Sequence, residues 1–234
     1  MNERIKRLSI LILAVGFAAS PIFSNGFGGF YRESFPMQVD RWPAQPVGWA
    51  FSVWGLIYLA LIATAAWAVL RPATMPGWSR AIHPLGLSLF IGLFWIEAAF
   101  RSPILATAMI LPMTAGAIAA MLRVGSGLWE QAALGLYAGW LTAASGVALS
   151  VVATGYGVLP PRIAAIALIG VVLAVAVAIA ARRPRVWSYR AGVIWALFGI
   201  IAANLSAGDG AIAAICGAGM VALFFAPRLL AGHR

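Results

Sequence analysis

The chain has 234 residues, of which 63% are hydrophobic and only 9% are charged, and its formal net charge is +10. Soluble domains carry about 25% charged residues, so this composition excludes a water-soluble globular protein. The positive charge would suit a nucleic-acid-binding protein, but no nucleic-acid-binding motif accompanies it, and we expect no such partner.

Charge-free apolar windows recur along the chain, each near the ~20 residues that a helix needs to cross a bilayer. They predict an all-α, polytopic integral membrane bundle of about eight transmembrane helices. The first helix resembles a signal peptide, but we expect it to remain uncleaved. The predicted spans are Leu8–Ser24, Val47–Leu70, Ile82–Phe100, Pro103–Leu122, Gln131–Ala153, Ile163–Ala181, Ala191–Ala207 and Gly210–Ala226.

The basic residues are divided unevenly between the two sides that these spans define. With the N-terminus inside, the inner segments hold twelve of them: Arg4, Lys6, Arg7, Arg71, Arg80, Arg123, Arg182, Arg183, Arg185, Arg190, Arg228 and Arg234. The outer segments hold four: Arg32, Arg41, Arg101 and Arg162. This positive-inside pattern predicts that both termini lie in the cytoplasm. We also expect contacts between these cations and membrane lipids.

The longest segment outside the predicted spans is Asn25–Pro46, which is rich in Gly, Pro and aromatic residues. Two interpretations remain open for this extramembrane loop. Its rings suit an anchor at the membrane interface. Its length also suits a lid over a cavity in the bundle.

The second predicted span places polar-tipped aromatic side chains deep in the membrane. At about 100° per residue, Phe51, Trp54 and Tyr58 share one face, whereas Trp49 and Trp67 lie on the other side at the two ends. End positions are typical of aromatic residues at the membrane interface. A Trp N–H or Tyr O–H far from water needs a hydrogen-bond partner, which lipid does not supply.

The fifth and third spans continue this pattern. In the fifth span Tyr137, Trp140 and Ala144 share a face, and the small residues on the opposite face suit close helix packing. Those small residues are Gly135, Gly139 and Ala143. In the third span Trp95 shares a face with Ser88 and Gly92, which leaves space beside the indole.

These faces predict an aromatic-lined cavity inside the membrane that binds a flat hydrophobic ligand. Rings that simply fill the bundle are the alternative. The candidate ligand-binding residues are Trp49, Phe51, Trp54, Tyr58, Ser88, Trp95, Tyr137, Trp140 and Ala144.

The stretches from Pro46 to Tyr58 ("PVGWAFSVWGLIY") and from Tyr137 to Ala144 ("YAGWLTAA") resemble the TspO/MBR family of translocator and tryptophan-rich sensory proteins. The family's Trp-x-x-Leu-Tyr is matched here by Trp54, Ile57 and Tyr58. Its fifth-helix motif is matched by Tyr137, Trp140 and Ala144. The chain departs from the family where Leu136 replaces a Pro and Ala148 an Asn, and where Ser88 and Gly92 replace a Gln and an Asn.

The resemblance implies a TspO-like five-helix core over residues 1–154, followed by three additional membrane helices over residues 155–234. It implies a binding protein for tetrapyrroles or sterol-like molecules, with a sensory or regulatory role in pigment metabolism. The three extra helices resemble longer bacterial members of the family, which implies a bacterial inner membrane, and the resemblance implies a porphyrin or haem-like ligand rather than a required cofactor. We expect no enzyme activity, because the sequence shows no catalytic motif. A homodimer or partners in a membrane complex would also fit the family. A small-solute transporter and a structural subunit of a pigment-containing membrane complex remain as alternatives.

The remaining polar residues offer no evident catalytic or metal site. Glu97 lies four residues before Arg101, a spacing that predicts an ion pair near a helix end. Asp209, between two glycines, is expected at a solvated loop tip, and Asn204 is expected to hydrogen-bond between helices. The two histidines and the one cysteine, Cys216, lie too far apart in the sequence to suggest a metal site.

Overall fold

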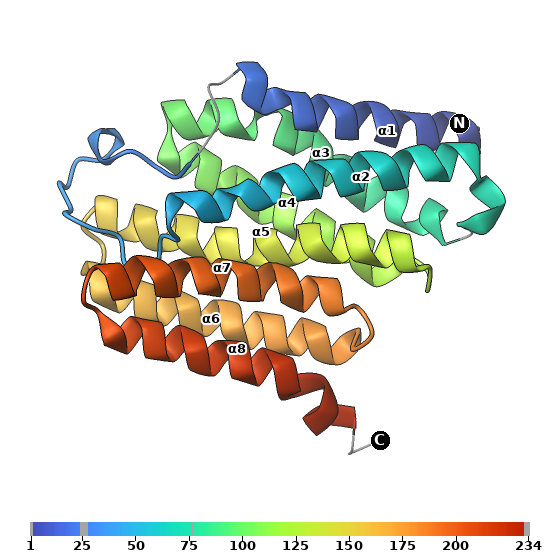
Figure 1. The fold of residues 1–234 in the computed structure, drawn as a ribbon. Coiled ribbons are helices and arrows are strands. Elements are labelled where there is room, and N and C mark those ends of the chain that lie inside the picture. The colour runs from blue at the N-terminus through green and yellow to red at the C-terminus, as the bar shows by residue number, and fades with distance from the viewer. Residues whose placement is uncertain (1, 24–27, 76, 232–234) are drawn as a thin grey trace.

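The computed structural model describes residues 2–23, 28–75 and 77–231, and every regular element among them is helical. Figure 1 shows the long helices running side by side as one bundle. The α-helices are α1 (Glu3–Ala19), α2 (Val53–Leu70), α3 (Trp78–Arg101), α4 (Pro103–Arg123), α5 (Leu128–Gly155), α6 (Pro161–Arg182), α7 (Trp187–Ser206) and α8 (Gly210–Ala231). Short 3₁₀ segments lie at Ser20–Phe23, Arg32–Ser34, Gly48–Ser52 and Pro72–Thr74.

Helices α1 to α7, with the adjoining 3₁₀ segments included for α1 (Glu3–Ile22) and α2 (Gly48–Leu70), are each long and apolar enough to cross a membrane, which confirms a polytopic membrane protein. The eighth predicted span, Gly210–Ala226, lies within helix α8, which runs from Gly210 to Ala231. Among the described residues its apolar stretch is Gly210–Phe225. Several helices also begin earlier than predicted: α1 starts at Glu3, where the Asn2 side chain accepts a hydrogen bond from the Arg4 N–H and caps the helix.

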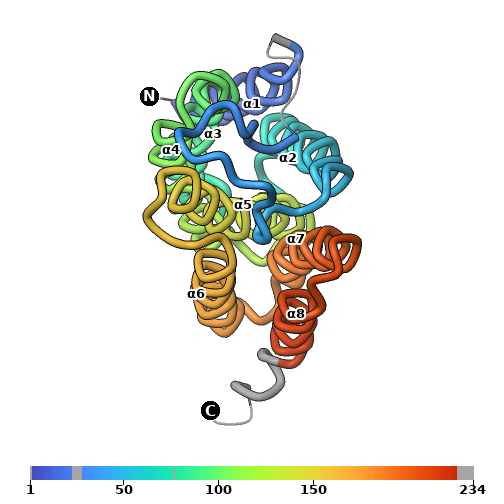
Figure 2. Tube along the Cα trace, turned by 90° about the vertical axis from the view of Figure 1, so that its left-hand side faces the viewer, coloured from blue at the N-terminus to red at the C-terminus, as the bar shows by residue number. Residues whose placement is uncertain are grey.

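The helices form two rings that share α5. In the first ring α1 contacts α2 and α3, α3 contacts α4, and both α4 and α2 contact α5. In the second ring α5 contacts α6 and α7, and α8 closes the ring by contacting both of them. Figure 2 shows α5 between the two groups of helices. Because it packs on both sides, α5 must present one face to each ring.

The segment between α1 and α2 crosses one end of the first ring, as the blue tube in Figure 2 shows. We call its residues 28–47 the strap. The aromatic side chains of Phe30, Phe35 and Trp42 in the strap are buried. The Met37 N–H also donates to the Gly155 carbonyl at the end of α5, at 3.0 Å. The strap is therefore packed onto the ends of the helices.

Candidate functional site

The predicted aromatic faces of α2 and α5 meet inside the first ring. Trp54 stacks on Tyr58, with ring centroids 5.4 Å apart and planes 21° apart. Trp54 also contacts Tyr137 at 6.4 Å and meets Trp140 edge-on at 6.2 Å. Phe51 extends the group through an edge contact with Trp140 at 5.8 Å. Five of the nine candidate residues thus form one continuous aromatic cluster.

The cluster has one further member that no sequence pattern predicted. Phe17 of α1 meets the rings of Trp54 and Tyr58 edge-on at 5.6 and 5.1 Å, and lies 6.0 Å from Tyr137. A Cβ at Gly92 would lie 2.7 Å from the Phe17 ring. The space that Gly92 leaves on α3 is therefore occupied by Phe17. No motif marks Phe17, and only its position on the buried face of α1 could have suggested it.

The Tyr137 hydroxyl has a protein partner. It lies 2.8 Å from the Ser88 Oγ, which in turn donates to the Met113 carbonyl at 2.7 Å. Since the Ser88 proton is used in that second bond, the Tyr137 O–H is the donor in the first. Trp95 is satisfied in a similar way, because its Nε1 donates to the Ala106 carbonyl of α4 at 2.9 Å. These two groups do not require a ligand.

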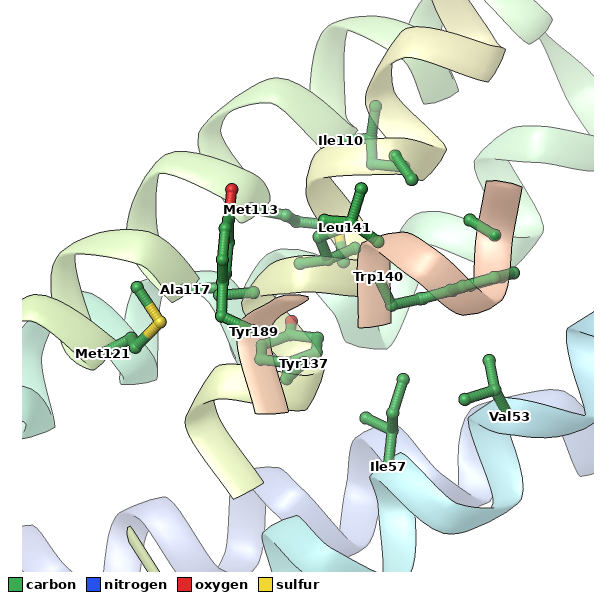
Figure 3. Close-up of a cluster of buried hydrophobic side chains, with 14 of the residues drawn as sticks. Val53, Ile57, Ile110, Met113, Ala117, Met121, Tyr137, Trp140, Leu141 and Tyr189 are labelled. Carbon is green, nitrogen blue, oxygen red and sulfur yellow. The ribbon is translucent and has the colours of Figure 1, made fainter. Parts of the chain in front are cut away.

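Trp140 differs from them. Its side chain is only 2% exposed, and its Nε1 has no hydrogen-bond partner among the described residues. Figure 3 shows Trp140 beside Tyr137, with Val53 and Ile57 of α2 pointing toward the two rings. An unpaired N–H in a dry interior costs about 1–3 kcal/mol. This indole is therefore the polar group in the cluster that most needs a partner.

A small cavity of about 30 Å³ adjoins Trp140, with Phe51 and Ala144 also in its wall. The strap covers the cavity with Gly29, Phe30, Gln45 and Pro46. The buried Oε1 of Gln45 also lacks a hydrogen-bond partner among the residues that the structure describes. The unpaired donor and the unpaired acceptor thus belong to two residues that line the cavity, although the surface of the cavity itself is almost entirely apolar. At this volume the cavity holds about one or two water molecules, so the cluster is nearly close-packed.

Trp49 lies away from this cluster. Its side chain is 46% exposed, and its ring meets Trp195 and Phe198 of α7 at 5.5 and 5.7 Å. This location agrees with its helical angle, which placed it opposite Trp54. Grouping Trp49 with the ligand-binding residues finds no support in the geometry.

The small residues of α5 lie on the side of the second ring. A Cβ on Gly135 would collide with Ser188 and Val186, and a Cβ on Gly139 would collide with the Tyr189 carbonyl of α7. Ala143 is buried as well. The glycines let α5 and α7 approach closely, while the opposite face of α5 carries Tyr137 and Trp140 into the first ring.

The strap is tied to the second ring by hydrogen bonds around Asn204 of α7. Its Nδ2 donates to the Pro43 carbonyl at 2.8 Å, and its Oδ1 accepts from Arg41 at 2.8 Å. Arg41 also pairs with Asp209 at 3.3 Å, and Arg162 lies 3.8 Å from the other oxygen of Asp209. We call Arg41, Asn204 and Asp209 the latch. Near the start of α2, the Val47 N–H donates to the Gly199 carbonyl at 3.1 Å.

Two predictions about these residues were wrong. Asp209 is not a solvated loop tip, since its side chain is only 15% exposed and pairs with two arginines. Asn204 is fully buried, and its partner outside its own helix is the strap rather than a second helix. By contrast the predicted pair of Glu97 and Arg101 is confirmed at 2.6 Å.

One buried acid was missed because it lies just before the predicted fifth span. Glu130 is 2% exposed, and its Oε1 accepts from the Gly127 N–H at 3.2 Å, which caps the start of α5. Its second oxygen has no hydrogen-bond partner among the described residues. Within those residues no group of three or more His, Cys, Asp or Glu side chains forms a metal-binding cluster.

Most of the chain matches the model of a known protein family. A family model described as TSPO-like protein matches residues 38–227, from the strap through most of α8. The match therefore includes α6–α8, which the sequence motifs left outside the resemblance. No match was found among curated proteins or among solved structures. Since the matched region covers most of the chain and includes the Trp54 and Trp140 motifs, this membrane protein belongs to the TSPO-like family.

Proposed function

We propose that this protein binds a flat hydrophobic molecule, a tetrapyrrole such as a porphyrin or a sterol-like compound, between α2 and α5 beneath the strap. The observation that carries the proposal is the buried Trp140 indole, whose unpaired Nε1 belongs to a residue lining the covered cavity. A ligand with an acceptor atom would satisfy this N–H, and a ligand N–H would satisfy the Gln45 Oε1. Porphyrins carry both kinds of group, on a flat surface that suits aromatic side chains.

Binding must enlarge the cavity. Pockets for ligands of this size usually measure about 300–1,000 Å³, whereas the cavity measures about 30 Å³. The strap has to move away from Trp140, and the rings of Trp54 and Phe51 have to change rotamer. The latch would then govern access, because it holds the part of the strap that includes Gln45 and Pro46.

In this proposal the protein is a sensor or regulator of tetrapyrrole or pigment metabolism in a bacterial inner membrane, with both termini in the cytoplasm. Binding rather than catalysis is the activity, and the bound porphyrin is a ligand rather than a required cofactor. The alternative of a small-solute transporter predicts net flux of the ligand across proteoliposomes. The alternative of a structural subunit predicts that the protein purifies with a membrane complex, whereas a regulator needs at most a second copy of itself.

The test is a titration of the purified protein with protoporphyrin IX, followed by tryptophan quenching and by the porphyrin absorbance. Trp140→Leu should weaken binding about 30-fold, because an aromatic contact and a hydrogen bond contribute about 1 kcal/mol each. Trp54→Leu should also weaken binding, by less, because Trp54 offers only ring contacts. Trp187→Leu is the matched control, since it removes an exposed indole at the start of α7. Equal affinities in all three variants would remove the site.

A further inference from the structure

A basic groove lies at the end of the bundle opposite the strap, where the α4–α5 and α6–α7 turns meet at the right of Figure 1. Its volume is about 490 Å³. One wall is formed by the turn from Val124 to Ser126 together with Gln131, and the other by the run from Arg182 to Arg185. Three arginines therefore border one hollow, and none of its described lining residues is acidic.

The side chain of Arg183 connects the two turns that form the groove. Its Nη1 donates to the Leu122 carbonyl at 2.8 Å, and its Nη2 donates to the Val124 carbonyl at 3.1 Å. These bonds satisfy carbonyls at the C-terminal end of α4, where a cation is favourable. They also join the two turns, so the hollow is part of the fold. Backbone carbonyls carry no formal charge, so the positive charge of Arg183 remains uncompensated by them.

Arg182 and Arg185 supply the free cationic groups. Both are exposed, and neither guanidinium group makes a hydrogen bond or an ion pair within the part of the chain that the structure describes. The nearby carboxylate of Glu130 is buried against the Gly127 N–H and is not part of the lining. The groove thus presents two unpaired guanidinium groups to whatever enters it.

The surroundings of the groove place it at the level of lipid headgroups. Trp187, two residues after Arg185, is 58% exposed, and Trp129, two residues before Gln131, is 72% exposed. Exposed Trp side chains at the ends of membrane helices mark the interface between lipid and water. The same end carries most of the chain's arginines, which is the arrangement expected on the side facing anionic cytoplasmic lipids.

We propose that this groove binds the phosphate group of an anionic phospholipid, with Arg182 and Arg185 contacting the phosphate oxygens. Guanidinium groups form paired hydrogen bonds to phosphate in a fixed geometry, which suits this role. The exposed indoles of Trp129 and Trp187 mark the depth of the membrane interface, where the phosphate and glycerol of such a lipid lie. The bound lipid would brace the α4–α5 turn against the α6–α7 turn. This proposal does not depend on ligand binding beneath the strap.

The experiment is native mass spectrometry of the detergent-purified protein titrated with phosphatidylglycerol or phosphatidylcholine. The double variant Arg182→Gln with Arg185→Gln should bind phosphatidylglycerol about 30-fold more weakly, since each arginine near an anionic surface contributes about a factor of five. The matched control is Arg4→Gln with Arg71→Gln. It removes two exposed arginines from the same end of the bundle and should retain wild-type affinity.

Two outcomes would overturn the proposal outright: equal loss of binding in both double variants, or equal affinity of the wild type for the two lipids. A thermal-shift arm compares phosphatidylglycerol with inorganic phosphate, and only the lipid should raise the melting temperature through the groove arginines. If inorganic phosphate alone gives the same arginine-dependent rise, the ligand is a soluble phosphate and the lipid assignment is wrong. Circular dichroism checks that both variants fold. We expect folding to be retained, because the removed side chains are exposed and make no hydrogen bonds to any described residue.

Discussion

Phe17 of α1 fills the space beside Gly92 of α3, so closely that a Cβ at position 92 would lie 2.7 Å from the Phe17 ring. The same ring touches Trp54, Tyr58 and Tyr137. Phe17 therefore occupies the volume in the first ring that a flat ligand would otherwise share. It links α1 to three other helices through one side chain.

Phe17→Ala should lower the free energy of unfolding by about 3 kcal/mol, because it leaves a cavity that the neighbouring rings cannot fully close. The measurement is chemical or thermal unfolding in detergent micelles. Phe94→Ala on α3 is the control, since Phe94 is 54% exposed and should change stability little. Similar losses in the two variants would mean that Phe17 is not a central packing residue.

The hydrogen bond between Tyr137 and Ser88 predicts energetic coupling across α5 and α3. Tyr137→Phe and Ser88→Ala should each destabilise the protein, and the double variant should be less destabilised than the sum of the two. A coupling of about 0.6 kcal/mol is typical of interhelical hydrogen bonds in membranes. A double-mutant cycle of unfolding free energies measures it, and strictly additive effects would contradict the bond.

The latch predicts that the strap is held closed by charged and polar contacts. Arg41→Gln should remove the ion pair with Asp209 and weaken the bond to Asn204. Amide hydrogen exchange in residues 28–47 should then speed up by about tenfold, which corresponds to a loss of about 1.4 kcal/mol of local stability. Glu33→Gln, at an exposed strap position, is the control. Unchanged exchange in Arg41→Gln would show that burial of the strap aromatics alone holds it.

The contact between α5 and α7 predicts opposite outcomes at two helical glycines. Gly139→Ala should destabilise the protein by about 1–3 kcal/mol, because the new Cβ would meet the Tyr189 backbone. Gly170→Ala on α6 has open space for a Cβ, and should be neutral or stabilising by up to about 1 kcal/mol through helix propensity. Melting temperatures of the two variants provide the comparison. A reversed order would mean that α5 and α7 are farther apart than the structure indicates.

The sequence was sufficient for the features that depend on one segment at a time. Composition required a membrane bundle, since so few charged residues cannot cover a soluble fold. Helical periodicity separated Trp54 and Tyr58 from Trp49, and in α5 it separated Tyr137 and Trp140 from Gly135 and Gly139. The four-residue spacing also predicted the pair of Glu97 and Arg101 correctly.

Only the tertiary structure decided what each face meets. Phe17 and Gly92, like Arg41 and Asp209, are far apart in the chain, and periodicity says nothing about such pairs. Phe17 of α1 fills the space that was expected beside Trp95. Asp209, which was expected in solvent, instead pairs with Arg41 of the strap. The Tyr137 hydroxyl bonds to Ser88, whereas the Trp140 N–H has no partner in the described part of the chain. The physical reason is that helix periodicity fixes the direction of a side chain, while the packing of separate helices fixes its neighbour.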